Sequence, residues 1–225
     1  MAHDPFITGR RMGAEGELLI IIDDFHPDPE ALIKAASTQS YGDPGKFYPG
    51  VRAAADPQHL QPCQAVLAEV LSKGFGAPGV RLAESSYSLV TAAPDSLAPI
   101  QRIPHFDGTD PNRLALLHYL TGPEEAGTAF FRQRPTGFEI ITEDRFATYK
   151  SALDEAYPKG PQSGYFVGGD DHFEQIDQVE AKYNRAVLYR GLTLHSGIIP
   201  EGFTFAQNPR EGRLTINSFL EVKAR

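Results

Sequence analysis

The chain has 225 residues and a formal charge of −8, with 41% hydrophobic and 22% charged residues. This composition is typical of a soluble globular protein and excludes a disordered or collagen-like chain. The excess of acidic residues argues against nucleic acid or an anionic membrane as the main partner, since both bind to clusters of lysine and arginine.

Cysteine content and hydropathy restrict the cellular setting. The single cysteine, Cys63, excludes an internal disulfide framework and a cysteine-rich zinc fold, and it fits a reducing compartment. The apolar run Leu18–Ile22 is far shorter than the roughly 20 residues that span a bilayer. The first residues, Met1–Gly16, lack the apolar segment of a signal peptide. We therefore expect a cytoplasmic protein without a membrane span.

The N-terminal third predicts one strand and two helices. Glu17–Phe25 is a strand-like apolar run closed by prolines. Asp28 can cap a helix whose first turn contains Pro29. After a Gly/Pro-rich irregular passage, Asp56-Pro57 opens a second predicted helix that ends near Gly74.

From about Leu82 the pattern changes to short β-type runs separated by turn clusters. Such a series is typical of a sandwich, jelly roll or barrel. A predicted helix, Asp144–Tyr157, and a Gly-rich loop over residues 159–171 interrupt it. The predicted strands are Leu82–Ala92, Ile100–Phe106, Leu114–Leu120, Thr128–Arg132, Phe138–Thr142, Ala186–Tyr189, Leu192–Ile198 and Leu214–Val222.

These elements predict a mainly β (α+β) fold. We expect one domain over residues 1–225, in which the strand and helices of residues 17–74 pack on a β core of residues 82–222. The length suits a single domain of this class.

A candidate metal site comes from two histidines and an aspartate. In a strand, residues two apart point to the same face, so His105 and Asp107 can converge on one ion. His195 lies at the end of another apolar run. Two histidines and one carboxylate suit non-haem Fe(II) chemistry with open coordination positions. Taken singly, however, the H-x-D pair also fits a surface turn, and His195 also fits a core histidine.

Arg213 completes the pattern at the start of the last predicted strand. On that strand Arg213, Thr215 and Asn217 share one face. The planar fork of an arginine can hold a carboxylate through two parallel hydrogen bonds. The combination of the H-x-D pair, a later strand-borne histidine and R-x-T is far more selective than any one of these parts.

At these motifs the sequence resembles the Fe(II)- and 2-oxoglutarate-dependent dioxygenases, and the prolyl-hydroxylase-like branch in particular. The resemblance covers roughly residues 17–222 and implies a double-stranded β-helix, or jelly roll. The segments that carry it are Pro104–Asp107, Leu116–Leu120, Gly127–Arg132, Leu188–Ser196 and Arg213–Glu221.

The resemblance also implies roles for single residues. It implies His105, Asp107 and His195 as iron ligands. It implies Arg213 as the partner of the distal 2-oxoglutarate carboxylate, with help from the hydroxyl groups of Thr215 and Tyr119. The spacing from His195 to Arg213 is longer than the family's usual one, and Arg210, in the loop before the strand, is an alternative partner.

The implied activity is hydroxylation of an unidentified small-molecule or peptidyl substrate by O2, with release of succinate and CO2. A jelly-roll binding module without turnover, or a cupin-like metalloenzyme that does not use 2-oxoglutarate, are the alternatives. We further expect the loop of residues 159–171 to close over the site as a lid. The oligomeric state is open, with a homo-oligomer as one option.

Overall fold

A computed structural model describes residues 3–223, and its main element is a seven-stranded antiparallel sheet. The strand order is β1-β2-β8-β5-β10-β4-β3, so the N-terminal hairpin extends the sheet at one edge. Alternating side chains of these strands face two different packing partners, as strand geometry requires. The strands are β1 (Phe6–Met12), β2 (Glu17–Asp23), β3 (Gly50–Ala54), β4 (Val80–Val90), β5 (Arg113–Tyr119), β8 (Arg185–Arg190) and β10 (Leu214–Val222).

A smaller antiparallel sheet packs against one face of the large one. It has the order β7-β6-β9, formed by β7 (Phe173–Val179), β6 (Thr128–Gln133) and β9 (His195–Gly197). A β-bridge between His105 and His195 adds a fourth extended segment beyond β9. From β5 onward the chain passes from one sheet to the other at each step, except between β6 and β7. This connectivity is that of a jelly roll, and the predicted mainly β jelly-roll class is confirmed.

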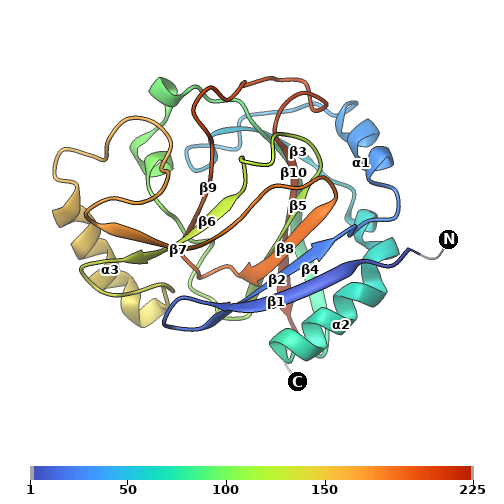
Figure 1. Ribbon diagram of the computed structural model, residues 1–225, viewed down its shortest axis with the longest axis horizontal. Helices are drawn as coiled ribbons and strands as arrows, with labels where there is room; N and C mark the ends of the chain where they lie inside the picture. The colour runs from blue at the N-terminus through green and yellow to red at the C-terminus, as the bar shows by residue number, and fades with distance from the viewer. Residues whose placement is uncertain (1–2, 224–225) are drawn as a thin grey trace.

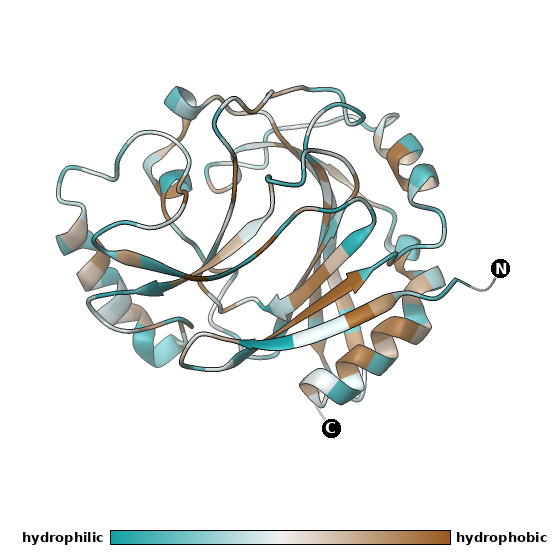
Figure 2. Cartoon of the chain, viewed as in Figure 1, coloured by the Kyte–Doolittle hydropathy of each residue, from teal (hydrophilic) through white to brown (hydrophobic). Residues whose placement is uncertain are grey.

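Three α-helices cover the outer faces of the sheets (Figure 1): α1 (Pro29–Ala36), α2 (Gln64–Phe75) and α3 (Glu143–Ala156). Helix α2 packs Leu67 and Leu71 on the outer side of the large sheet, against apolar residues of β2, β5 and β8. Helix α3 packs Tyr149 behind the small sheet. Figure 2 shows the apolar residues gathered along the strands and on α2. A separate cluster fills the space between the two sheets and includes Phe130 and Tyr189.

Several predicted elements are wrong in detail. The second helix is divided at Pro62 into a 3-10 segment (Pro57–Cys63) and α2, because proline has no N–H to donate inside a helix. The predicted strands Ile100–Phe106 and Phe138–Thr142 do not form: the first begins within a 3-10 helix (Pro99–Arg102), the remaining residues are irregular, and each segment contributes one β-bridge. Strands β1, β3 and β7 were not predicted, since none of them alternates apolar and polar residues regularly.

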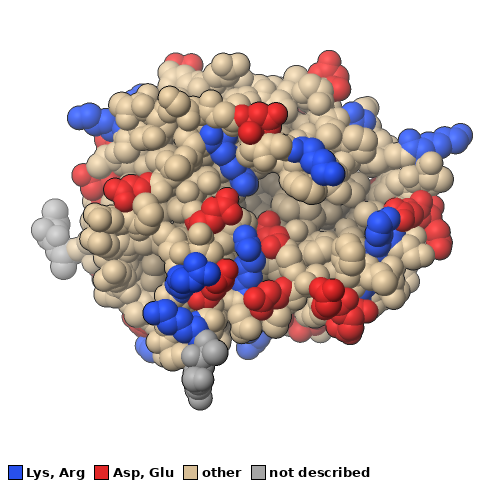
Figure 3. Space-filling view, turned by 180° about the vertical axis from the view of Figure 1, so that it is seen from behind, with Lys and Arg blue, Asp and Glu red and all other residues tan. Residues whose placement is uncertain are grey.

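The surface carries both signs of charge. Seen from behind, basic and acidic side chains are interspersed over the face and around the hollow near its centre (Figure 3). Within residues 3–223, no helix has both the length and the apolar character that crossing a membrane demands.

Candidate active site

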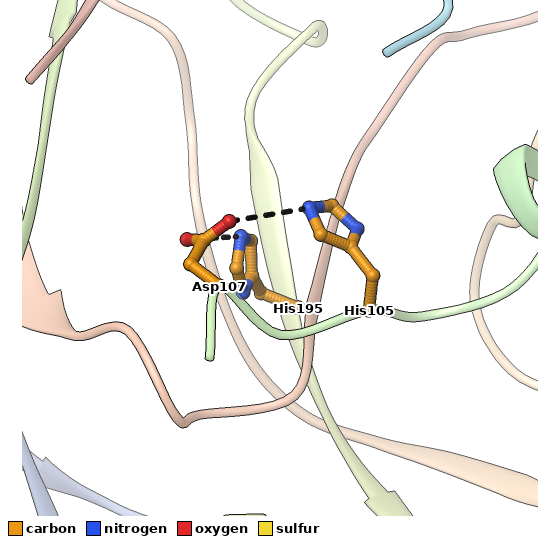
Figure 4. A group of neighbouring side chains, drawn as sticks. All are labelled: His105, Asp107 and His195. Carbon is orange, nitrogen blue, oxygen red and sulfur yellow. Dashed lines mark ion pairs between the residues drawn. The ribbon is translucent and has the colours of Figure 1, made fainter. Parts of the chain in front are cut away.

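Three side chains from two segments that are distant in the sequence meet at one end of the small sheet. His105, Asp107 and His195 each offer a ligand atom, and these atoms lie within 4.8 Å of one another. The Asp107 carboxylate is the centre of the group: one oxygen lies 4.0 Å from His105 Nε2 and the other 3.5 Å from His195 Nε2. Figure 4 shows the three side chains directed toward one another, two from the same loop and the third from β9.

Backbone hydrogen bonds fix this arrangement. The His105 N–H donates to the His195 carbonyl and the His195 N–H donates to the His105 carbonyl, both at 2.8 Å. The Asp107 N–H donates to the carbonyl of Gly191, at 2.6 Å. The segment around the H-x-D pair is therefore fastened at both residues to the segment that carries the second histidine, although it is too short to count as a strand.

The orientation of the His195 ring suits metal binding. Its Nδ1 lies 2.9 Å from the Thr193 carbonyl, and only the N–H form of Nδ1 can donate to that oxygen. Nε2, which faces Asp107, then keeps its lone pair. This contact is the outer hydrogen bond that commonly orients a metal-ligating histidine.

The site disfavours charge on its own groups. Burial lowers the pKa of His105 well below its ordinary value, and His195 and Arg52 lower it further. Burial raises the pKa of Asp107, while the neighbouring His195, Arg113 and Arg52 side chains oppose that rise. The His105 side chain is 47% exposed, but it opens into a cavity. A neutral His105 beside a desolvated carboxylate belongs to a donor set that a divalent cation would complete.

These donors fit a metal ion in kind and in distance. Ligand atoms held at about 2.1 Å from one ion lie roughly 3 Å apart, so small side-chain movements would bring the three groups onto it. Two histidines and a carboxylate are the donors of the non-haem Fe(II) facial triad, which leaves further positions open. His105, Asp107 and His195 therefore form a candidate metal centre.

The centre opens into a cavity of about 730 Å³ between the two sheets. Its walls are largely aromatic and aliphatic, as is usual for small-molecule sites, with few charged groups. Besides the three candidate ligands, those charged groups are Arg52, Glu84, Arg113, Lys150, Asp154 and Arg213.

Arg213 lines this cavity and is 4% exposed. It immediately precedes β10 rather than opening it. Its Nε donates to the Ala126 carbonyl at 2.6 Å and its Nη2 to the Gly127 carbonyl at 3.0 Å. Within residues 3–223 it forms no ion pair with an aspartate or glutamate. A buried guanidinium without a carboxylate partner, beside a cavity, is suited to an anionic ligand.

Two glycines beside Arg213 occupy positions where a side chain would not fit. Gly122 adopts a φ of +115°, and a Cβ there would lie 3.0 Å from the Arg213 Cα. At Gly127 a Cβ would lie 1.9 Å from the Val179 carbonyl oxygen, so no larger residue fits the backbone that accepts the Arg213 hydrogen bond.

The two hydroxyl groups expected to assist Arg213 have other partners in this structure. Thr215 is fully buried, and its hydroxyl donates to Asn217 Oδ1 at 2.7 Å. The Tyr119 hydroxyl shares a 2.6 Å hydrogen bond with Thr128, and the Arg213 guanidinium lies 5.4 Å from its ring centroid. Thr128 lines the cavity, and the sequence does not predict it as a site residue. Roles for Thr215 and Tyr119 in co-substrate binding stay predictions.

Arg210, the alternative to Arg213, lies elsewhere. It forms an exposed ion pair with Glu30 at 2.7 Å and lines a separate depression of about 320 Å³ near α1. The backbone carbonyls of Pro209 and Gly212 accept hydrogen bonds from Thr121, which holds this long loop against the sheet. Of the two arginines, only Arg213 reaches the cavity of the candidate ligands.

The loop of residues 159–171 borders the same cavity. Tyr165 lines it and donates a hydrogen bond to the Ala92 carbonyl at 2.7 Å, and its ring stacks on Phe205. Phe166 packs on Phe131 of the small sheet. The loop is therefore placed where a lid would be, and its movement stays a prediction. At its end, Asp170 accepts backbone hydrogen bonds from the next turn, as in a solvated turn.

The sequence matches, over residues 3–220, the family described as "Family of unknown function (DUF6445)". The chain belongs to this family. No curated protein matches it. A DUF6445 assignment therefore names a group of related sequences without stating an activity.

Solved structures with similar folds share little sequence with this DUF6445 protein. AviO1 from Streptomyces viridochromogenes Tue57 is 15% identical, with a TM-score of 0.48 over 96% of this chain and 92% of that chain. The non-heme alpha ketoglutarate dependent epimerase SnoN is 14% identical, with a TM-score of 0.48 over 90% and 76%. An N-substituted L-amino acid dioxygenase from Burkholderia ambifaria AMMD is 13% identical, with a TM-score of 0.46 over 98% and 96%. These TM-scores are too low to assign a function, which must be argued from the side chains of this chain.

Proposed function

We propose that this protein is a non-haem Fe(II)- and 2-oxoglutarate-dependent oxygenase that hydroxylates a small organic substrate. One observation carries the proposal: His105, Asp107 and His195 converge at a cavity that also contains Arg213, a buried cation without a carboxylate partner. A metal at one end and a cation at the other match a co-substrate with two acidic ends. Bound iron and 2-oxoglutarate would supply the oxidation of an unactivated C–H bond by O2, with release of succinate and CO2.

The chain's own residues would position these groups. His105, Asp107 and His195 hold the metal, and the Thr193 carbonyl keeps His195 in the required tautomer. Arg213 receives the distal carboxylate of 2-oxoglutarate, since its fork is already oriented by the carbonyls of Ala126 and Gly127. The apolar cavity wall and the Tyr165 loop exclude water from the site.

The two alternatives differ from this proposal in what they bind. A cupin-like metalloenzyme needs the metal but has no use for a carboxylate clamp, and a binding module needs no turnover. Titration of anaerobic protein with Fe(II), then with 2-oxoglutarate, distinguishes them, and succinate release is measured afterwards. We expect stoichiometric metal, 2-oxoglutarate binding that depends on the metal, and slow succinate formation. Metal binding without 2-oxoglutarate binding would favour the cupin-like alternative.

The Arg213→Met variant tests the co-substrate assignment. Methionine keeps much of the side-chain volume and removes the charge-assisted hydrogen bonds, worth roughly 1.5–3 kcal/mol. We expect the affinity for 2-oxoglutarate to fall by about ten- to a hundredfold, while metal content stays at the wild-type level. Arg210→Met, in the exposed ion pair with Glu30, is the matched control and should bind 2-oxoglutarate normally. Equal affinities in the two variants would contradict the assignment.

A further inference from the structure

A group of polar atoms without hydrogen-bond partners lies at the β3 side of the cavity. Arg52 Nε is buried without a hydrogen-bond partner within residues 3–223, and the buried hydroxyl groups of Tyr48 and Ser88 lie near each other without a well-aligned hydrogen bond. The Arg52 guanidinium lies 4.3 Å from the centroid of the Tyr48 ring, and Arg52 pairs with Ser88 across β3 and β4. Buried donors without well-aligned acceptors are uncommon in native proteins, so this group indicates a missing acceptor.

Arg52 and Tyr48 share a cavity with the candidate metal centre. Both line the same 730 Å³ cavity as His105, Asp107 and His195. Arg52 forms no ion pair with any described aspartate or glutamate and donates no side-chain hydrogen bond to a described residue. Its situation differs from that of Arg213, which is held by two backbone carbonyls. The Arg52 guanidinium lies instead on the ring of Tyr48.

A second arginine in the cavity, Arg113, is less well suited to bind an anion. Its guanidinium lies 4.1 Å from the ring centroid of Phe219, and its Nε also lacks a partner. However, Phe219 pairs across the sheet with Glu84, whose carboxylate lines this part of the cavity. A negative charge is thus already present near Arg113. The residues paired in line with Arg52 across the neighbouring strands are Ser88 of β4 and Thr215 of β10, and neither is acidic.

We propose that Arg52 and Tyr48 bind a carboxylate of the substrate, so that the substrate is an organic acid. The guanidinium fork and the phenol O–H are donors, and a carboxylate supplies the acceptors that both lack. The rest of the wall includes Phe47, Phe146 and Phe219, which suits an apolar body attached to the acid. This inference rests on the proposed function, since it names the substrate class of the same site.

Binding of small acids to the inhibited complex tests the inference. Protein loaded with Zn(II) and N-oxalylglycine, a 2-oxoglutarate analogue that does not react, is titrated with phenylacetate, phenylacetamide and phenyl phosphate by ligand-observed NMR. We expect phenylacetate to bind at least about tenfold more tightly than the neutral amide, and more tightly than the phosphate. Arg52→Gln should abolish the preference for the acid, and Tyr48→Phe should weaken it by about threefold or more.

Controls separate this site from the other groups of the cavity. Arg113→Gln should keep the preference for phenylacetate, and Arg52→Lys, which restores a charge, should recover part of it. Zinc and N-oxalylglycine should bind Arg52→Gln as they bind the wild type, which also shows that the variant is folded. Four results would each overturn the inference. In the Arg52→Gln variant, these are a preference for the acid that survives and a loss of N-oxalylglycine binding. In the wild type, they are equal binding of acid and amide and tighter binding of phenyl phosphate than of phenylacetate.

Failure of the proposed function would look different. Wild-type protein that binds no N-oxalylglycine would contradict the oxygenase assignment. An Arg52-dependent preference for phenylacetate would then still establish the anion site. Conversely, if the protein binds zinc and N-oxalylglycine but shows no preference for the acid, the proposed function stands and the inference about Arg52 and Tyr48 is wrong.

Discussion

Two groups of histidines occupy opposite faces of the large sheet, and they differ in where their nitrogens point. On the cavity side, His105 and His195 direct Nε2 toward the Asp107 carboxylate. On the helix-covered side, His26 and His118 surround Asn184. The Asn184 amide oxygen lies 3.0 Å from His118 Nε2 and accepts a hydrogen bond from the backbone N–H of His26 at 3.0 Å, while the Asn184 NH2 group donates to the backbone carbonyl of His26.

The comparison shows that burial does not identify a metal ligand. His118 is 2% exposed, and burial lowers its pKa to about 3. Its ring packs edge-on against Phe25, and among the described residues it belongs to no cluster of candidate metal ligands. His195 is just as inaccessible, but a carbonyl fixes one ring nitrogen and a carboxylate faces the other. A carboxylate beside a free imidazole nitrogen, at a cavity, distinguishes the candidate ligands.

Removal of one histidine from each group gives the largest expected difference. His195→Ala should lower the affinity for Fe(II) or Mn(II) by more than the roughly 10- to 100-fold that follows loss of an outer-shell partner, because a ligand itself is lost. His118→Gln should leave metal affinity unchanged. Metal content of the purified proteins and calorimetric titration with Mn(II) measure both. Stoichiometric metal in His195→Ala would refute the three-ligand site.

Asn184 should contribute to the stability of the fold but not to the affinity for metal. Its φ of +61° is left-handed, so Asn184→Gly removes the side chain without backbone strain. We expect the free energy of unfolding of the metal-free protein to fall by about 2–4 kcal/mol, since several buried partners lose a hydrogen bond. Urea unfolding measures this change. An accompanying loss of Mn(II) affinity would show that the two histidine groups are coupled and would break the distinction between them.

The pH dependence of stability sharpens the comparison further. The pKa of His118 is about 3 in the folded protein, chiefly because of burial, and about 6.5 in an unfolded chain. Between these values the unfolded state binds the extra proton, so His118 contributes stability that is present above pH 6.5 and decreases as the pH falls. We expect wild-type protein to lose on the order of 2 kcal/mol more than His118→Gln between pH 7 and pH 5. Parallel stability curves for the two metal-free proteins would rule out this contribution.

Sequence reasoning succeeded where one segment contains its own signal. Glu17–Asp23 forms a strand, Asp28 caps α1 at the Ala31 N–H, and α3 lies within one residue of its predicted bounds. It failed at Pro62, whose missing N–H divides a helix that hydrophobic spacing alone predicts as continuous. The H-x-D pair was also placed in a strand, whereas only His105 forms a bridge.

The sequence by itself determined the alternating strands, the helix caps and the kinds of side chain available for a metal and an acid. These features depend on neighbouring residues, whose spacing sets which face they share. Only the tertiary structure decided that His195 meets Asp107, that Arg213 rather than Arg210 enters the cavity, and that Arg52 lies there without a partner. Such contacts join strands that are remote in the chain, so their geometry depends on how the two sheets pair and pack, which no local pattern specifies.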